Sequence, residues 1–504
     1  MPRIIGLALL VGLVGCREAE APSGAGSSSG GDESESTAPA TVGLGAQCVP
    51  DERRSCYGGP LGSEGLGVCR AGEQVCAADG TEWLPCADEV LPAAREDCST
   101  AQDDDCDGSV VCEPELVWTK QTQASFRHLA LDGQGHTYVG SSGGAFEYEG
   151  VVLDDVYLLK VDEQGDLLWH HSFIHPGVDW VADLAVDAEQ RSTMVGYYTL
   201  DFDAGGGMLP YADERRGFVA RYDGDGNHLW SRGTTFTSVS AVDVGPDGSV
   251  YVAGRRDLLD ESLVVVAFTS DGIPAWERRL SGVFGLSDRA IAVAVLDSGE
   301  VVVGAIFSPS QSVEPTLDGE PVDLGLYGAY ALRLSAGGTL IDERPLHTEL
   351  TVPLDNLELF GLEDGTLLAV FTAHLEGFNS GVLAHFTDEL EPVSEQWLGT
   401  EATVRGVDVG PDDTVVLALE FYGALDVSPI GVHVPPNVET VGLLGIDRQG
   451  QGRWLELLRD PASVWVHGLA VGPDGSVVAR ISSGTSVEVG GQAIEGATLS
   501  RFRP

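Results

Sequence analysis

An internal repeat over residues 114–504 constrains the fold of this chain more than any other feature of its sequence. One half of the unit is an apolar strand, a tight turn and a second strand, clearest over 241–254 (AVDVGPDGSVYVAG) and again over 469–479. In the turn, proline presets φ and glycine accepts a positive φ. The flanking residues alternate between apolar and polar, which indicates half-buried strands.

The turn aspartate marks seven copies of the unit, spaced by 48 to 67 residues: Asp132, Asp187, Asp247, Asp297, Asp364, Asp412 and Asp474. A second hairpin follows each turn and ends in a tryptophan in five copies: Trp169, Trp230, Trp276, Trp397 and Trp454. The fourth copy, at 333–340, has none. Four strands per unit is the composition of a propeller blade. The sequence therefore predicts an all-β, seven-bladed β-propeller with four-stranded blades, in which the tryptophans pack in the core or between blades.

The seventh copy lacks its tryptophan strand and stops at 497–502. A matching segment, Glu115–Lys120, resembles Asp166–His171 and lies at the other end of the repeat region. We therefore expect this N-terminal strand to complete the last blade, which removes two exposed sheet edges. The segments 196–202, 217–222 and 227–230 are similar to bacterial β-propeller repeats of the seven-bladed class. That resemblance spans 114–504 and implies the fold but almost nothing about activity.

Residues 1–16 have the pattern of an export signal. Arg3 precedes an apolar run over 4–14, and small residues follow. This run is shorter than the roughly 20 residues that a membrane-spanning helix needs. Leu13-Val14-Gly15-Cys16 resembles the lipobox of a bacterial lipoprotein, in which the cysteine is lipidated and becomes the new N-terminus. The alternative is an ordinary secretory signal with an incidental cysteine. Residues 17–47, rich in Ser, Gly and acidic residues, are predicted to be a disordered tether.

Residues 48–113 form a predicted cysteine-rich module. Apart from Cys16, every cysteine of the chain lies there: Cys48, Cys56, Cys69, Cys76, Cys86, Cys98, Cys106 and Cys112. An even number in an exported chain predicts that all of them form disulfides, although spacing alone does not assign the pairs. A domain this small usually needs such cross-links to stay folded.

The segments 67–76, 83–86 and 105–108 resemble the cysteine-rich modules of myxobacterial surface lipoproteins, which are often described as metal-binding. Those modules tend to read Asn-Asp-Cys-Asp-Gly followed by acidic residues, whereas Val110-Val111-Cys112 follows here. Asp103, Asp105 and Asp107 match the start of a calcium loop. Pro114 stands where the loop's bidentate glutamate belongs, so the motif is not a full EF-hand. It is either a calcium site or a solvated acidic turn, and calcium is the candidate cofactor although none is required.

Three other motifs are interpreted as structural. Residues 223–227 carry an oxygen-bearing side chain at every second position, as a metal-binding loop does. They occupy a position that is a hairpin turn in every copy. Residues 140–144 match the nucleophile-elbow string, which needs a strand leading into a helix, and no helical pattern is nearby. His170, His171 and His175 cluster beside Trp169, and adjacent strand residues point to opposite faces, so a surface or groove role is expected rather than a metal site.

Charge narrows the choice of partners. With 78 acidic and 28 basic residues, the net charge of -50 repels nucleic acid, which we exclude as a partner. The expected attachment is to a membrane through the lipid anchor, in the cell envelope. An aspartate directly after the lipidated cysteine would resemble an inner-membrane retention signal. Arg17 occupies that position here, which favours the outer membrane or cell surface.

We expect a non-enzymatic binding or scaffold protein that holds an unknown protein or glycan. Its predicted contact loops are the insertions at 200–216, 307–328 and 422–440, because loops on a rigid scaffold carry binding. Two alternatives remain open. The first is a metal-binding surface protein that acts through the cysteine-rich module, and the second is a glycan-cleaving propeller enzyme.

Overall fold

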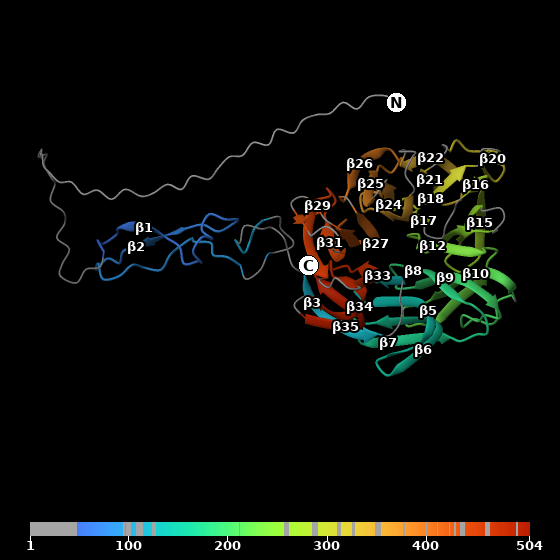
Figure 1. Ribbon diagram of the computed structural model, residues 1–504, viewed down its shortest axis with the longest axis horizontal. Coiled ribbons are helices and arrows are strands. Elements are labelled where there is room, and N and C mark those ends of the chain that lie inside the picture. The colour runs from blue at the N-terminus through green and yellow to red at the C-terminus, as the bar shows by residue number, and fades with distance from the viewer. Residues whose placement is uncertain are drawn as a thin grey trace, which may run out of the picture. The chain divides into compact units, whose positions relative to one another are not determined.

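A computed structural model describes most of the chain (Figure 1). The described residues are 48–93, 96, 102–106, 114–122, 128–210, 212–256, 262–284, 291–309, 314–324, 328–347, 354–375, 378–399, 401–410, 412–422, 424–427, 430–433, 439–458, 464–489 and 492–504. The predicted signal, lipid site and tether, and also Cys98, Asp107 and Cys112, lie outside them. The described residues divide into two compact units, one of 48–55 and 73–87 and the other of 56–72 and 88–504.

The cysteine-rich region has little regular secondary structure and is cross-linked by disulfides. Strands β1 (Arg53–Cys56) and β2 (Gly72–Val75) form a two-stranded sheet. One disulfide joins Cys48 to Cys76 and another joins Cys69 to Cys106. Cys56 and Cys86 are also disulfide-bonded. The prediction of a disulfide-rich module is therefore confirmed for all the cysteines that the structure describes.

The rest of the chain folds into seven antiparallel sheets, the blades of a propeller. The first three blades are β4 (His128–Leu131), β5 (Thr137–Tyr148), β6 (Val151–Val161) and β7 (Leu167–Phe173); β8 (Trp180–Val186), β9 (Ser192–Leu200), β10 (Ala212–Tyr222) and β11 (His228–Gly233); and β12 (Ser238–Val244), β13 (Val250–Arg255), β14 (Leu263–Phe268) and β15 (Pro274–Ser281). The next two are β17 (Ile291–Val295), β18 (Val301–Pro309), β21 (Gly328–Leu334) and β22 (Leu340–His347); and β23 (Leu354–Gly361), β24 (Leu367–Leu375), β25 (Phe378–Phe386) and β26 (Pro392–Trp397).

The last two blades are β27 (Ala402–Val409), β28 (Val415–Tyr422), β31 (Glu439–Ile446) and β32 (Gly452–Leu458); and β33 (Val464–Val471), β34 (Val477–Val489), β35 (Gln492–Arg503) and β3 (Glu115–Thr122). Short additional strands are β16 (Val283–Phe284), β19 (Thr316–Leu317), β20 (Glu320–Pro321), β29 (Ala424–Val427) and β30 (Ile430–His433). The predicted seven-bladed, all-β propeller with four-stranded blades is confirmed.

The blades form a ring around an axis. The first strand of each blade is innermost, and each of these inner strands lies beside the inner strand of the next blade, from β4 through β33 and back to β4. Figure 1 shows the same order, with the colour running around the ring from cyan to red. As predicted, the seven turn aspartates lie in or beside the turns between the first and second strands.

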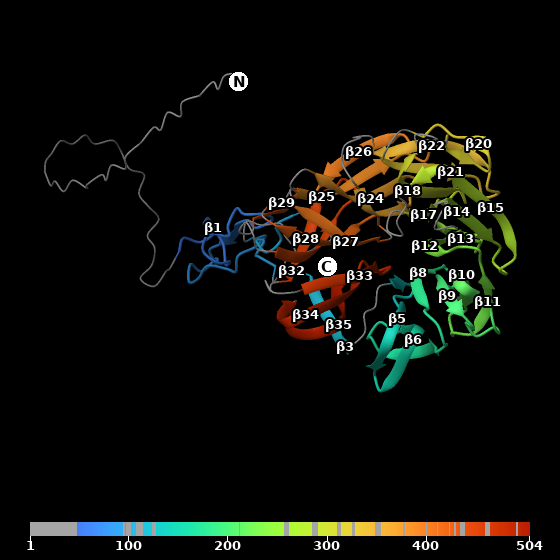
Figure 2. The ribbon, with the colours of Figure 1, turned by 45° about the vertical axis from the view of Figure 1, so that its right-hand side comes forward.

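The N-terminal strand closes the ring, as the sequence predicts. Strand β3 pairs antiparallel with β35, so that Trp118 lies opposite Arg501 and Thr119 opposite Ser500. The two hydroxyl groups of the second pair are 2.9 Å apart. In Figure 2, β3 lies beside the red strands of the last blade, although it begins the propeller sequence. The last blade is therefore built from both ends of the propeller sequence.

Burial explains why third strands and outer strands differ in sequence, as one example of each from two blades shows. Every residue of β14 (LVVVAF) is buried, because both faces of this third strand pack against neighbouring blades. The outer strand β26 (PVSEQW) is largely exposed and has a polar face. An apolar run in the middle of the unit and an alternating run at its edge thus follow from their positions in the sheet.

The repeating tryptophans join neighbouring blades. In four of them the indole Nε1 donates a hydrogen bond to a carbonyl oxygen in the second turn of the next blade, at 2.7 to 3.0 Å: Trp118 to Glu163, Trp169 to Gly224, Trp230 to Ser270 and Trp276 to Ala336. Trp397 differs, because its Nε1 donates to the Glu395 carboxylate in its own strand. Each of the four rings that bond to the next blade also lies against the positive-φ glycine of that turn. A Cβ on Gly272, for example, would approach Trp230 Cδ2 to 2.3 Å. The predicted packing role is confirmed, and Trp454 is fully buried.

Candidate functional site

The two faces of the propeller carry different connections. On the face that we call the turn face, five-residue turns join the first strand of a blade to its second and the third to its fourth. They are closed by pairs of backbone hydrogen bonds, as in Asp132 N to His136 O and Gly135 N to Asp132 O. The opposite face, the loop face, holds the connections from second to third strand and from blade to blade. Because strands of a blade are antiparallel, this separation is complete around the ring.

All three predicted insertions join a second strand to a third and therefore share the loop face. They connect β9 to β10, β18 to β21 and β28 to β31. The sequence predicts that these insertions are special but cannot show that they lie on one face. The structure brings them to one side, although parts of 310–327 and 423–438 lie outside the described residues.

These insertions also reach back to the preceding blade. Strand β19 extends the third blade by pairing with β15, Leu317 lying opposite Leu280. Leu425, in the insertion of the sixth blade, bridges to Gly399. His175 Nε2 lies 3.0 Å from the carbonyl oxygen of Asp203, which links the loop after β7 to the insertion after β9. The insertions are therefore anchored to the scaffold at their bases.

Exposed apolar side chains occur on two of these joined loops. Ile174 and Val178, between β7 and β8, are exposed, and so is Met208 in the insertion after β9. On the same face, Trp465 at the start of β33 exposes 48% of its surface. Single exposed apolar residues are common, but large ones on neighbouring loops are typical of contact surfaces.

Five carboxylates lie on the inner strands. One is Asp355, and we call the other four, Asp183, Asp243, Glu358 and Asp408, the axial carboxylates. The three aspartates each accept a backbone hydrogen bond from the inner strand of the next blade, at 2.7 to 2.9 Å: Asp183 from Val242, Asp243 from Val295 and Asp408 from Val471. Each also accepts one from the residue that follows it in its own strand. They therefore join blades around the axis.

The surroundings of Asp243, Asp408 and Glu358 raise the pKa of each carboxyl. Enclosure by protein raises the pKa of Asp243 to about 6 against the lowering effect of its hydrogen bonds, and repulsion from Asp183 adds to the rise. Enclosure raises the pKa of Asp408 to about 6 as well. The pKa of Glu358 is raised further, by enclosure and then by repulsion from Asp183 and Asp408. The Glu358 side chain is nevertheless exposed to solvent, so water weakens both effects on its pKa.

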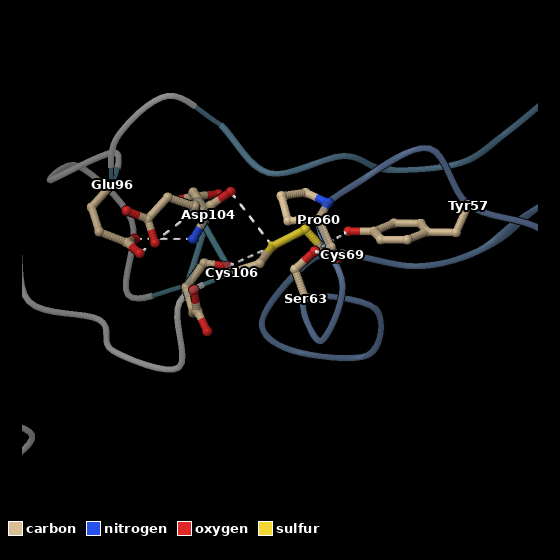
Figure 3. Close-up of a disulfide and its surroundings, with 9 residues drawn as sticks. Tyr57, Pro60, Ser63, Cys69, Glu96, Asp104 and Cys106 are labelled. Carbon is tan, nitrogen blue, oxygen red and sulfur yellow. Dashed lines mark hydrogen bonds between the residues drawn. A yellow bond between two sulfur atoms is a disulfide. The ribbon is translucent and has the colours of Figure 1, made fainter.

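A second acidic group lies in the cysteine-rich region. Oxygen atoms of Glu96, Asp103 and Asp105 lie within 4.8 Å of one another, a spacing that suits a metal ion. The Cys69–Cys106 disulfide fixes the loop that carries the two aspartates, and Asp103 is buried. Figure 3 shows Glu96 beside Asp104, which lies between Glu96 and this disulfide, and Glu96 Oε2 accepts a 2.9 Å hydrogen bond from Asp104 N.

The structure thus brings together two of the three predicted metal ligands, while Asp107 lies outside the described residues. It adds Glu96, which sequence reasoning missed because no motif spacing links it to Asp103. Burial raises the pKa of the Glu96 carboxyl, and repulsion from Asp105 contributes to the rise. Three carboxylates that repel one another are a donor set suited to a hard cation such as calcium.

The other candidate motifs take structural positions. Asp223 caps its turn by accepting hydrogen bonds from Asp225 N and Asn227 N, so 223–227 is the predicted plain turn. Residues 140–144 lie within strand β5, without a helix after them. His171 Nε2 contacts the carbonyl oxygen of Gly226 at 2.7 Å, which makes it part of the contact between the first two blades.

Two cavities lie at contacts between blades. One of about 220 Å³ lies where the ring closes, lined by residues that include Trp118, Glu163 and Arg501. Another of about 50 Å³ lies between the fifth and sixth blades, beside His385 and Arg448. Within the described residues, no helix is long and apolar enough to cross a membrane.

These features define a seven-bladed β-propeller with a disulfide-rich N-terminal region. No family model matches the sequence, and no curated protein matches it. Among solved structures, the chain is similar to the C-terminal WD40 domain of Sif2, with 8% identity, a TM-score of 0.40 and coverage of 78% of this chain and 99% of that one. It is also similar to an ulvan lyase of polysaccharide lyase family PL25, with 10% identity, a TM-score of 0.42 and coverage of 72% and 93%.

A third similar structure is the propeller domain of the trilobed protease from Pyrococcus furiosus, with 11% identity, a TM-score of 0.39 and coverage of 74% of this chain and 96% of that one. Enzymes and non-enzymes occur among these structures. At such identities and TM-scores, the likeness carries no argument about activity.

Proposed function

We propose that this chain is a lipid-anchored protein of the bacterial cell envelope, whose propeller is a non-enzymatic binding or scaffold module for a protein or a glycan. The observation that carries the binding role is the concentration of all three insertions on the loop face, opposite a face of short closed turns. Rigid blades hold these loops in fixed positions, which reduces the entropy lost when a ligand binds.

The exposed apolar residues also favour the loop face as the binding surface. Ile174, Val178 and Met208 lie on loops that hydrogen bonds fasten together, so a partner would meet a preformed surface. The resemblance of 13–16 to a lipobox supports the anchor, and the acidic residues after it suit an extended tether. Attachment through acyl chains at Cys16 would hold the propeller at the outer membrane or cell surface.

The binding role is tested with an isolated cell-envelope fraction and a glycan panel. Wild-type protein and a Met208→Glu/Trp465→Glu variant would be compared with a turn-face variant, Asp297→Lys. The proposal predicts a retained ligand that the loop-face changes release and the turn-face change does not. Equal retention of both variants would contradict it. Loss of membrane association in Cys16→Ser tests the anchor separately.

Calcium binding by the cysteine-rich region is a second candidate function, favoured by the convergence of Glu96, Asp103 and Asp105. Calcium added to a chelator-treated sample should raise the melting temperature of the wild-type chain. Asp105→Asn and Glu96→Gln should abolish that rise. Asp104→Asn, which changes the adjacent carboxylate outside the group, should keep it. The absence of any rise at millimolar calcium would exclude this function.

A further inference from the structure

The contact between the fifth and sixth blades lacks the indole ring that four other blade contacts share. In those four, the tryptophan lies opposite a residue of the third strand, beside a shift in register: Trp118 opposite Arg501, Trp169 opposite Lys160, Trp230 opposite Arg221 and Trp276 opposite Ala267. In the fifth blade, the residue opposite His385 and beside the same shift is Ser394. Ser394 therefore occupies the position at which those blades carry a tryptophan.

A second contact supports this alignment. The residue two positions after the tryptophan contacts the carbonyl oxygen of the glycine in the next blade's second turn: His171 to Gly226, Arg232 to Gly272 and Arg278 to Gly338. Gln396, two positions after Ser394, donates in the same way to the Gly450 carbonyl oxygen at 2.9 Å. Trp397 follows, and its ring centroid lies 6.0 Å from that of His347 in the fourth blade. Trp397 therefore does not replace the missing indole.

The fourth blade also lacks this tryptophan, but a different side chain packs at its contact with the fifth blade. Asp342 lies at the tryptophan position, opposite Arg333. In the second turn of the fifth blade, Leu390 takes the position of the glycine, with a positive φ of 58°. Its side chain is buried in the apolar core that the fourth and fifth blades share. A leucine on the turn thus packs where the tryptophan is absent.

Neither the indole nor the leucine is present between the fifth and sixth blades, and the cavity of about 50 Å³ lies there. Its floor is apolar and buried, formed by Leu383, Val415 and Ile446. Ser394 and the turn at 447–450 also line it. Because Ser394 is exposed, solvent reaches the cavity from the side of β26. An apolar floor with a few polar groups around it is typical of a ligand pocket.

Two polar groups at this cavity have no hydrogen-bond partner among the described residues. One is the carbonyl oxygen of Arg448, whose counterparts accept the indole N–H at the four other contacts. The other is the buried Nε2 of His385, which lines the cavity. Polar groups left unpaired in a protein are costly, so a ligand that pairs with one of them gains free energy.

We propose that this cavity binds the indole ring of a tryptophan carried by a partner protein, with the indole N–H directed at the Arg448 carbonyl oxygen. The cavity is too small to enclose a larger ligand, so the rest of the partner would lie outside it, along β26. Partial insertion of the ring is sufficient, since Trp118, Trp169 and Trp276 are themselves only partly buried. The site lies on the turn face and does not depend on the proposed binding role of the loop face.

The probe is N-acetyltryptophanamide, and the measurement is the melting temperature of the full chain. The wild type should rise by about 2 °C at saturating probe, because a ligand that binds only the folded state stabilises it. N-acetylleucinamide, which has no ring, should cause no rise. Ser394→Trp should melt at a higher temperature without probe and lose the response, since its new side chain fills the cavity. Val393→Trp adds the same ring at the exposed neighbouring position and should keep the response.

Hydrogen exchange of the wild type locates the site without a variant. The probe should protect amides of 447–451 and leave those of 223–227 unchanged, because Trp169 already occupies the equivalent place there. The loop-face variant Met208→Glu/Trp465→Glu should respond as the wild type does, which separates this site from the loop face. Three results would overturn the proposal: no rise in the wild type, an equal rise in Ser394→Trp, or equal protection of both turns.

Discussion

Trp118 Nε1 donates a 2.7 Å hydrogen bond to the carbonyl oxygen of Glu163, and this contact joins the strand that closes the ring to the first blade. The same residue lies opposite Arg501 across the β3–β35 pair. Arg501 is buried and donates to the carbonyl oxygen of Gly135 at 2.8 Å, also in the first blade. Closure therefore depends on side chains as well as on strand pairing.

Replacing Trp118 should weaken this closure in graded steps. Trp118→Phe keeps an aromatic ring against Gly165 and loses one hydrogen bond, for an expected cost of about 1 kcal/mol in the free energy of unfolding. Trp118→Ala also loses the packing and should cost about 2 kcal/mol or more. Val117→Ala, at the exposed neighbouring position, is the control and should have little effect. Chemical denaturation measures all three, and equal stabilities would show that the contact is dispensable.

A methyl group at Gly272 should be more damaging than one at Gly475. Both glycines have a positive φ, of 75° and 73°, so alanine is strained at each by about 1–2 kcal/mol. Only at Gly272 would the new Cβ meet a tryptophan, at 2.3 Å from Trp230 Cδ2, whereas nothing lies within 4 Å at Gly475. We expect Gly272→Ala to cost about 2 kcal/mol more than Gly475→Ala, by thermal or chemical unfolding. Similar costs would mean that the tryptophan moves away freely.

Asp132 should make part of the stability of the first blade sensitive to acid. Burial opposes ionisation of this carboxyl, but hydrogen bonds from His136 and Lys160 lower its pKa below the ordinary value of 3.8. Its contribution is therefore present above about pH 3.8 and is lost as the pH falls through the lower folded value.

Asp132→Asn should destabilise the protein at neutral pH by about 3 kcal/mol, because it leaves the buried Lys160 ammonium without its carboxylate. The difference from the wild type should shrink below about pH 4. Asp297→Asn, at an exposed turn aspartate, is the control. A difference between Asp132→Asn and the wild type that is independent of pH would contradict this assignment.

Reduction should affect the two parts of the chain differently. All cysteines after Cys16 lie between 48 and 112, so the propeller sequence from 114 onward contains none. A reducing agent should therefore abolish any calcium-dependent shift, because the Cys69–Cys106 link fixes the loop that carries Asp103 and Asp105. The main melting transition of the propeller should be unchanged within error. A large fall in that transition on reduction would show that the disulfides support the propeller too.

Most of the propeller could be predicted from the sequence because its signals are local and repeated. The turn at 245–249 is encoded by residues next to one another, and seven copies make the strand count redundant. Even the closing strand could be found, since Glu115–Lys120 repeats the pattern of Asp166–His171. Local patterns that agree with one another along the chain are what such a derivation needs.

The candidate sites could be predicted only in part, because they depend on contacts between distant residues. Glu96 lies near Asp103 because disulfides determine how this region folds. The pairing of eight cysteines cannot be deduced from the sequence. Asp183 and Glu358 come from blades that are far apart in sequence, and nothing near either residue marks its position at the axis. The face on which the insertions lie likewise follows from strand order and not from their composition.

The central claim is that the loop face binds a partner, and hydrogen exchange in the presence of that partner tests it most directly. Hydrogen exchange of the full chain would be measured with and without the retained envelope component or glycan. The account predicts added protection in the loops at 174–179 and 201–210 and near Trp465, with none in the turns at 132–136 and 187–191. Protection confined to the turn face, or to the cysteine-rich region, would contradict it.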